Sequence, residues 1–237
     1  MRYLIKDGNV VGADDGEDVY GSPEALESRL NYHQTQLAAL SKSESAGSVQ
    51  RAGILLHMAD LYHQLEKNEE CWNLAREAFS DFADSNDWNG AVEACYNMVL
   101  SEQSDALTAL GHGIWLGVTY PIDLELSMAM LQMLVDESPK EADTRAIAAA
   151  ASSYLADVRS EKGKNDDLVF FAHQMLGRVA EEHSQVEGKM AFDIWVRSLE
   201  LDDPAVFLPK LSGVVDQLVS PDGWWIDRDV LREELPH

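Results

Sequence analysis

The strongest constraint on the fold of this chain is a pair of helical patterns that follow one another between residues 52 and 83. In each pattern, apolar residues recur at intervals of three and four, so a helix would place them on one face. The first face contains Leu55, Met58, Ala59 and Tyr62, and the second contains Cys71, Leu74, Ala75, Ala78 and Phe82. Small residues in both faces allow the two helix axes to approach closely. The stretch therefore predicts two helices packed against each other across a short turn.

Helical patterns of the same kind continue as far as residue 219. We expect an opening helix over about 23–40 and others near 46–66, 68–83, 87–102, 104–118, 122–137, 140–161, 166–183, 186–201 and 204–219. Several starts place a capping Ser or Asp directly before Pro, which is tolerated at the first helical position. These starts are Ser22-Pro23, Ser138-Pro139, Asp203-Pro204 and Ser220-Pro221, with Glu141 completing a capping box in the second. Successive helices with short turns pack antiparallel, so we expect an all-α array of helix hairpins.

Both ends of the chain differ from this helical middle. In the run YLIKDGNVVG, residues 3–12, the dipeptide Asp7-Gly8 separates two β-prone segments, which is typical of a tight β-hairpin. An acidic run with glycines follows. We therefore expect three parts: a small N-terminal β-hairpin and acidic loop over 1–20, a helical domain over 21–219 and a capping tail over 220–237.

The residues of the opening pair also resemble a known repeat family, the tetratricopeptide repeat, a helix-turn-helix unit of about 34 residues. The family's first-helix positions fall on Leu55, Met58, Ala59 and Tyr62, and small positions of its second helix fall on Cys71 and Ala78. Glu66 stands where a turn glycine is frequent, Ala75 where a large apolar residue is usual, and Ala83 where a proline closes the repeat. Later segments match less well, so the resemblance covers one good repeat and two or three degraded ones. It implies a tetratricopeptide-like α-α superhelix and, by analogy, binding of a peptide or protein.

Charge limits the partners that such a chain can bind. It carries 42 Asp and Glu against 18 Lys and Arg, a formal net charge of -24. This surface repels phosphate backbones and anionic lipids, so we expect neither nucleic acid nor membrane as a partner. The acidic surface serves either for solvation alone or for attracting a basic protein or peptide.

The two cysteines bear on the compartment. Cys71 and Cys95 are too few for a disulfide framework, and both lie in apolar helical patterns. We expect buried thiols in a reducing compartment. Because the first residues also lack the apolar stretch of a signal peptide, a cytoplasmic location is expected.

The clearest candidate for a ligand pocket is the stretch LGHGIWLGVTYP, residues 110–121. It places His112 between two glycines and close to Trp115 and Tyr120. These three residues could line a small-molecule pocket in an enzyme or a ligand sensor. Alternatively, the glycines of this stretch allow close helix packing, which we favour in a helical array.

A metal site receives little support from the sequence. His57 and His63 lie six positions apart, which is about 120° around a helix, so they cannot reach the same ion. We therefore expect no metal and no cofactor.

The adjacent tryptophans Trp224 and Trp225 are the notable residues of the tail, since two neighbours on one helical turn cannot both face inward. They either cap the last helices or anchor a partner protein or a second subunit. Taken together, the sequence favours a non-catalytic interaction module or assembly adaptor, with the enzyme or sensor around His112 as the alternative.

Overall fold

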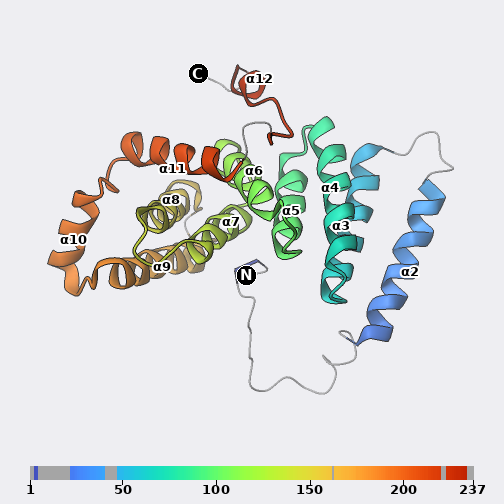
Figure 1. Cartoon of the computed structure of the whole chain (residues 1–237), viewed down its shortest axis with the longest axis horizontal. Coiled ribbons are helices and arrows are strands. Elements are labelled where there is room, and N and C mark those ends of the chain that lie inside the picture. The colour runs from blue at the N-terminus through green and yellow to red at the C-terminus, as the bar shows by residue number, and fades with distance from the viewer. Residues whose placement is uncertain (1–2, 5–21, 41–46, 162, 220–222, 234–237) are drawn as a thin grey trace.

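The computed structural model describes residues 3–4, 22–40, 47–161, 163–219 and 223–233, and these residues form helices and no strands (Figure 1). The helices are α2 (Pro23–Leu40), α3 (Ser48–Gln64), α4 (Asn68–Asp84), α5 (Trp88–Leu100), α6 (Ala106–Thr119), α7 (Leu124–Glu137), α8 (Asp143–Arg159), α9 (Asp166–Ser184), α10 (Gly188–Ser198), α11 (Pro204–Leu218) and α12 (Arg228–Glu233). The all-α expectation is confirmed. The β-hairpin expected near the N-terminus lies outside the described residues, apart from Tyr3 and Leu4, which form no strand. No described helix combines the length and the apolar content that crossing a membrane requires.

Of the four helix starts predicted before a proline, two are confirmed, one is wrong and one lies outside the described residues. The hydroxyl oxygen of Ser22 accepts a hydrogen bond from the backbone N–H of Ala25 at 3.2 Å, and α2 begins at Pro23. A carboxylate oxygen of Asp203 accepts from the N–H of Ala205 at 2.9 Å, and α11 begins at Pro204. Both starts are confirmed. The fourth, Ser220-Pro221, lies outside the described residues.

The capping box at Ser138 is wrong. Ser138 follows the last residue of α7, and its hydroxyl donates to the carbonyl of Leu134 at 2.6 Å, whereas α8 begins at Asp143. The residue before a proline is pushed out of the helical region, and Ser138 has φ -90° and ψ 141°. The Ser-Pro pair therefore ends one helix here instead of starting the next.

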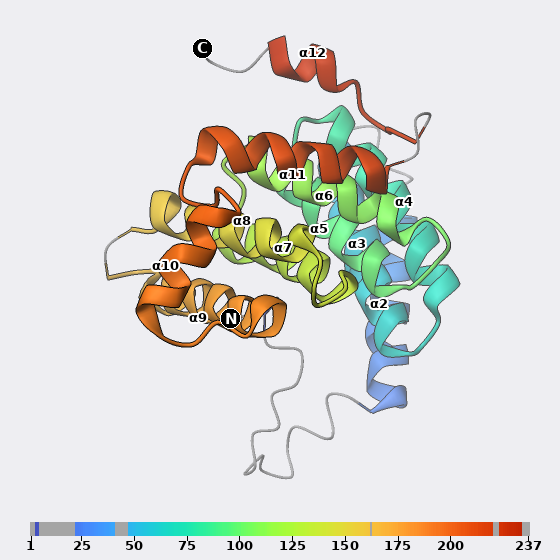
Figure 2. The ribbon, with the colours of Figure 1, turned by 60° about the vertical axis from the view of Figure 1, so that its left-hand side comes forward.

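The helices pack as successive side-by-side pairs, an arrangement compatible with a helical repeat. Each of α3 and α4, α5 and α6, and α7 and α8 forms a pair of neighbours joined by a short connection. Helix α3 also contacts α5, and α5 contacts α7, so these three form one layer of the array. Helix α11 crosses α6 and α8 on the other layer (Figures 1 and 2). The array therefore has two distinct layers on which further segments can pack.

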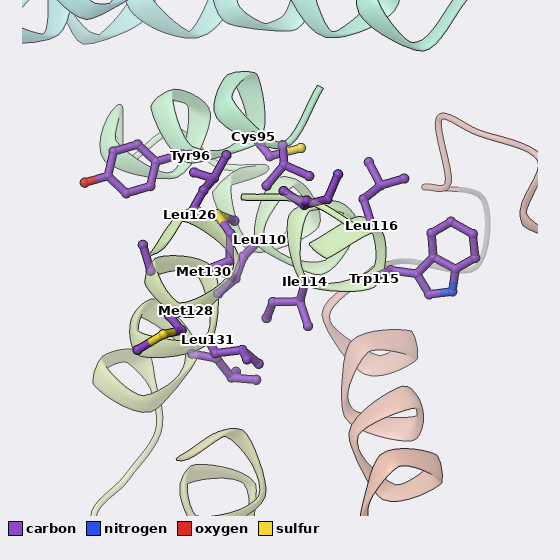
Figure 3. Packing of buried hydrophobic residues seen from close by; sticks show 14 of the residues in the cluster. Cys95, Tyr96, Leu110, Ile114, Trp115, Leu116, Leu126, Met128, Met130 and Leu131 are labelled. Atoms are coloured by element: carbon purple, nitrogen blue, oxygen red, sulfur yellow. The ribbon is translucent and has the colours of Figure 1, made fainter. Parts of the chain in front are cut away.

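Helix α6 lies at the centre of the core because two of its glycines leave room for neighbours. A Cβ atom at Gly113 would lie 2.3 Å from Cε of Met130 and 3.1 Å from Cβ of Cys95. A Cβ atom at Gly111 would lie 2.5 Å from a methyl carbon of Val219. The close-packing interpretation of these glycines is confirmed. Figure 3 shows the result, with side chains of α6 packed against those of α7.

Three successive turns of the array use a left-handed residue that is not glycine. The backbone φ angle is 58° at Glu66, 56° at Asn86 and 53° at Glu102, and these residues follow α3, α4 and α5. A side chain with a Cβ atom makes this conformation unfavourable by about 1–2 kcal/mol. The turn glycine that Glu66 replaces in the family pattern would therefore suit the backbone better.

Candidate functional site

His112 is buried in α6 with both ring nitrogens in hydrogen bonds. Its Nδ1 lies 2.8 Å from the carbonyl oxygen of Thr108, and its Nε2 lies 2.8 Å from the backbone nitrogen of Trp225. A carbonyl only accepts and an amide N–H only donates, so the ring is neutral, with its hydrogen on Nδ1. His112 is 0% exposed, and no ring nitrogen is left for a ligand while the tail is docked.

The surroundings of His112 favour this neutral form. The pKa of His112 is lowered to about 4, chiefly by burial and in smaller part by the positive charges of Arg76 and Arg228. The hydrogen bond to Thr108 acts in the opposite direction. A neutral imidazole is the only state in which Nε2 can accept the N–H of Trp225, so ring protonation and tail docking exclude each other.

Both tryptophans of the tail pack on the ring of His112. The ring of Trp225 is stacked on it at 4.3 Å between centroids with an interplanar angle of 19°, and the ring of Trp224 lies 4.6 Å away. The inference that only one of them can face inward assumed a helix, but α12 begins only at Arg228. A non-helical backbone at residues 223–227 allows both rings to reach the same histidine.

Two arginines contact the rings of these tryptophans and connect the tail to the helices. The guanidinium of Arg76, in α4, lies 4.1 Å from the ring centre of Trp225, and that of Arg228 lies 3.7 Å from the ring centre of Trp224. Arg228 also pairs with Asp216 of α11 at 2.6 Å. We call Trp224, Trp225 and Arg228 with His112 the tail clasp; it joins the tail to α4, α6 and α11.

The other two predicted pocket residues continue this aromatic row without enclosing a common cavity. The ring of Trp115 lies 6.2 Å from that of Trp224 and 6.3 Å from that of Tyr120, and Tyr120 stacks on Trp88 at 5.1 Å. Trp115 also lines a pocket of about 230 Å³ between α6 and α11, whose lining includes neither His112 nor Tyr120. The three residues therefore belong to one row of aromatic rings and do not form the walls of one pocket.

A larger concavity, which the sequence did not predict, lies across α3 and α5. It has a volume of about 600 Å³. We call it the α3–α5 groove, and it is lined by Tyr3, Gly53, Leu56, His57, Asp60, His63, Gln64, Phe82, Asp87, Asn89, Gly90, Glu93, Tyr96, Asn97 and Leu100. Among the described lining residues, Asp60, Asp87 and Glu93 carry carboxylates and none is a lysine or an arginine. These described side chains give the groove an acidic character at neutral pH.

One face of each helix builds the groove. Residues 53, 57, 60 and 64 of α3 and residues 89, 93, 96 and 100 of α5 have the same spacing of four, three and four positions. This spacing keeps each set on one side of its helix. Apart from Gly53 and Leu100, these residues carry polar groups, and their matching spacing was a signal present in the sequence, but only the packing of α3 against α5 turns the two faces into a groove.

Two buried polar atoms of the groove lining have no hydrogen-bond partner. They are Nδ1 of His63 and Oδ1 of Asn97. Asn97 is 5% exposed, and its amide nitrogen donates to the carbonyl of Glu93 at 3.1 Å, which fixes which end of the amide is the free acceptor. A buried acceptor without a partner is costly, so these atoms are candidates for contact with a ligand.

His57 and His63, whose spacing argues against a shared metal ion, both lie in this lining. Nδ1 of His57 lies 2.7 Å from the carbonyl oxygen of Gly53, and its ring stacks on that of His33 at 5.4 Å. Among the described residues, no group of three His, Cys, Asp or Glu side chains could hold a metal ion. Cys71 and Cys95 are buried free thiols, as expected, and burial raises the pKa of Cys71 to about 12.

Tyr3 lies at the edge of the groove and is bound to two helices. Its backbone N–H donates to Glu125 of α7 at 2.7 Å, and its hydroxyl donates to Glu93 of α5 at 2.9 Å. The hydroxyl of Tyr96 donates to the carbonyl of Tyr3 at 3.2 Å, and the two rings meet edge to face at 5.2 Å.

Comparison with known proteins found no match for this chain among protein-family models, curated proteins or solved structures. The tail clasp and the α3–α5 groove are therefore the features of this chain from which a function can be inferred.

Proposed function

We propose that this protein is a non-catalytic interaction module of the tetratricopeptide type, which binds a peptide or a protein segment in the α3–α5 groove. The observation that carries the proposal is the pair of unpartnered polar atoms, on His63 and Asn97, in the lining of a groove of about 600 Å³. A peptide brings main-chain N–H groups at regular intervals, and such a group would satisfy the free oxygen of Asn97.

The charge of the groove supports a basic partner. Asp60, Asp87 and Glu93 lie in its lining, in a chain with a formal net charge of -24. Lys or Arg side chains of a partner would be attracted over a distance of about 10 Å at 0.1 M salt. The proposed binding therefore weakens as ionic strength rises.

The alternative function, an enzyme or sensor around His112, has less support. A ligand there would have to compete with Thr108 and Trp225, which occupy both ring nitrogens. The pocket beside Trp115 has about 230 Å³ and is mainly apolar, with Arg232 as the one charged residue in the described part of its lining. It is small for a substrate site, because ligand pockets commonly exceed about 300 Å³.

The test is affinity capture from native extract with two double variants. Asp60→Asn with Asp87→Asn removes two groove charges, and both asparagines keep the side-chain oxygens that accept from Gln64 and cap α5. Glu141→Gln with Asp202→Asn removes two exposed charges elsewhere. We expect one stoichiometric partner to be captured by the wild type and the control, lost by the groove variant and lost at high salt. Equal capture by all three proteins would reject the groove as the binding site.

A further inference from the structure

The contacts of Tyr3 have the form of a bound peptide residue. Its N–H, its carbonyl and its hydroxyl each hydrogen-bond to α5 or α7, through residues between 90 and 122 positions away in the chain. The N–H of Leu4 also points to Glu125, at 3.5 Å. Both main-chain groups and the side chain are thus bound at the edge of the same groove that we assign to a partner.

We propose that Glu93, Tyr96 and Glu125 form a seat for a peptide tyrosine, and that the chain's own Tyr3 fills this seat until a partner peptide displaces it. This inference rests on the proposed function, because it assigns a regulation to the same groove. We call this set of three residues the tyrosine seat.

The chemistry of the tyrosine seat defines its ligand. Two carboxylates accept the hydroxyl and the main-chain N–H, so the side chain must donate a hydrogen bond. A phosphorylated tyrosine brings about two negative charges to the carboxylate of Glu93 and is repelled. The edge of Tyr96 against the ring makes an aromatic residue preferable to an aliphatic one. The ligand class is an unphosphorylated tyrosine in a basic peptide.

The sequence around Tyr3 fits this class. Arg2 and Lys6 are the only basic residues before Arg29, and they flank Tyr3 in a chain that is otherwise strongly acidic. The first six residues therefore carry the charge that complements the acidic groove.

Displacement is favourable because Tyr3 leaves part of the groove unused. Oδ1 of Asn97 and Nδ1 of His63 remain without hydrogen-bond partners although Tyr3 is bound. A longer peptide can first contact these atoms and then replace Tyr3 at the seat. It gains hydrogen bonds that the chain's own segment does not make.

The test measures binding of a labelled peptide with the sequence of residues 1–8 to the full chain by fluorescence anisotropy. In the wild type the covalently attached Tyr3 competes at high local concentration, so the peptide binds weakly. We expect Tyr3→Ala to bind it about 10-fold or more tightly than the wild type. Tyr3→Phe, which keeps the ring but loses the bond to Glu93, should fall between them. Tyr32→Ala, at an exposed tyrosine of α2, should behave as the wild type.

Two further comparisons test the chemistry of the seat on the Tyr3→Ala background. Adding Glu125→Ala should weaken peptide binding about 10-fold or more, since it removes the acceptor of two N–H groups, whereas adding Glu141→Ala should not. A phosphotyrosine peptide should show no binding at concentrations that saturate with tyrosine. The proposal is overturned by equal peptide affinity of wild type and Tyr3→Ala, or by undiminished binding of the phosphopeptide.

The outcomes separate this inference from the proposed function. If the peptide binds Tyr3→Ala through Glu125 but neither protein captures a foreign partner, the tyrosine seat stands and the adaptor role fails. If a partner is captured through Asp60 and Asp87 equally by the wild type and Tyr3→Ala, the adaptor role stands and displacement fails.

Discussion

Glu66 adopts a backbone conformation that is unfavourable for a residue with a side chain. It closes the turn between α3 and α4 with φ 58°, a conformation that glycine adopts without steric cost. The sequence already marked this position as a departure from the turn glycine of the family pattern. The structure supplies the physical reason why the departure matters.

We therefore expect Glu66→Gly to stabilise the protein by about 0.5–1 kcal/mol, because the relief of left-handed strain exceeds the extra freedom of the unfolded chain. Thermal and urea unfolding measure the effect. The matched control is Glu70→Gly, in the first turns of α4, which should destabilise by up to about 1 kcal/mol. A lower unfolding midpoint for Glu66→Gly would show that the turn gains nothing from glycine.

His112 makes stability depend on pH in a defined window. Its pKa is about 4 in the folded protein, against about 6.5 in an unfolded chain. Between these values the unfolded state binds a proton that the folded state does not, so this contribution is complete above pH 6.5 and is lost as pH falls towards 4. The loss reaches about 3 kcal/mol.

The measurement is the free energy of unfolding between pH 7 and pH 4 for the wild type and for His112→Gln. Glutamine can still accept the N–H of Trp225, but it does not titrate. Since carboxylates titrate in both proteins, the difference between the two curves isolates the histidine. Parallel curves would mean that His112 is not held neutral by the fold.

At the scale of elements, the helices could be predicted from sequence because the apolar spacing that forms them is local. Ser138 failed as a helix start because Ser-Pro also follows helix ends, and the dipeptide alone does not distinguish the two. The tail clasp could not be predicted, since the conformation of Trp225 depends on His112, which is 113 positions earlier in the chain. The α3–α5 groove and the tyrosine seat likewise depend on how distant helices pack.

The tail clasp is expected to contribute measurably to stability. Trp225→Ala removes the ring stacked on His112 and beneath Arg76 but keeps the backbone N–H, and we expect a loss of about 2 kcal/mol, below the range for fully buried tryptophan. Val230→Ala, at a side chain 51% exposed in α12, should change stability by less than about 0.5 kcal/mol. Equal effects of the two substitutions would indicate that the tail does not pack on α6.

For the whole molecule, charge acts in opposite directions on folding and on binding. A formal net charge of -24 produces repulsion within the compact state, and salt screens it. We expect the free energy of unfolding to increase by about 1 kcal/mol, and Tm by about 3 °C, between 0.05 and 0.5 M sodium chloride.

Calorimetry at the two salt concentrations measures this effect, and potassium chloride should give the same rise if screening is the cause. Capture of a basic partner should weaken over the same range. A fall of Tm with salt would indicate that specific ion pairs, such as that of Arg228 with Asp216, outweigh the general repulsion.

The contact between His112 and Trp225 also implies an order in which parts of the chain fold during synthesis. The ring of His112 and the face of Phe79, which Trp225 meets edge-on at 5.3 Å, are made more than a hundred residues before their cover. In a nascent chain, α3 to α7 can therefore fold while this aromatic surface is still exposed to solvent. Folding is finished only when Trp224 and Trp225 leave the ribosome, and until then the growing chain presents the kind of apolar surface that chaperones bind.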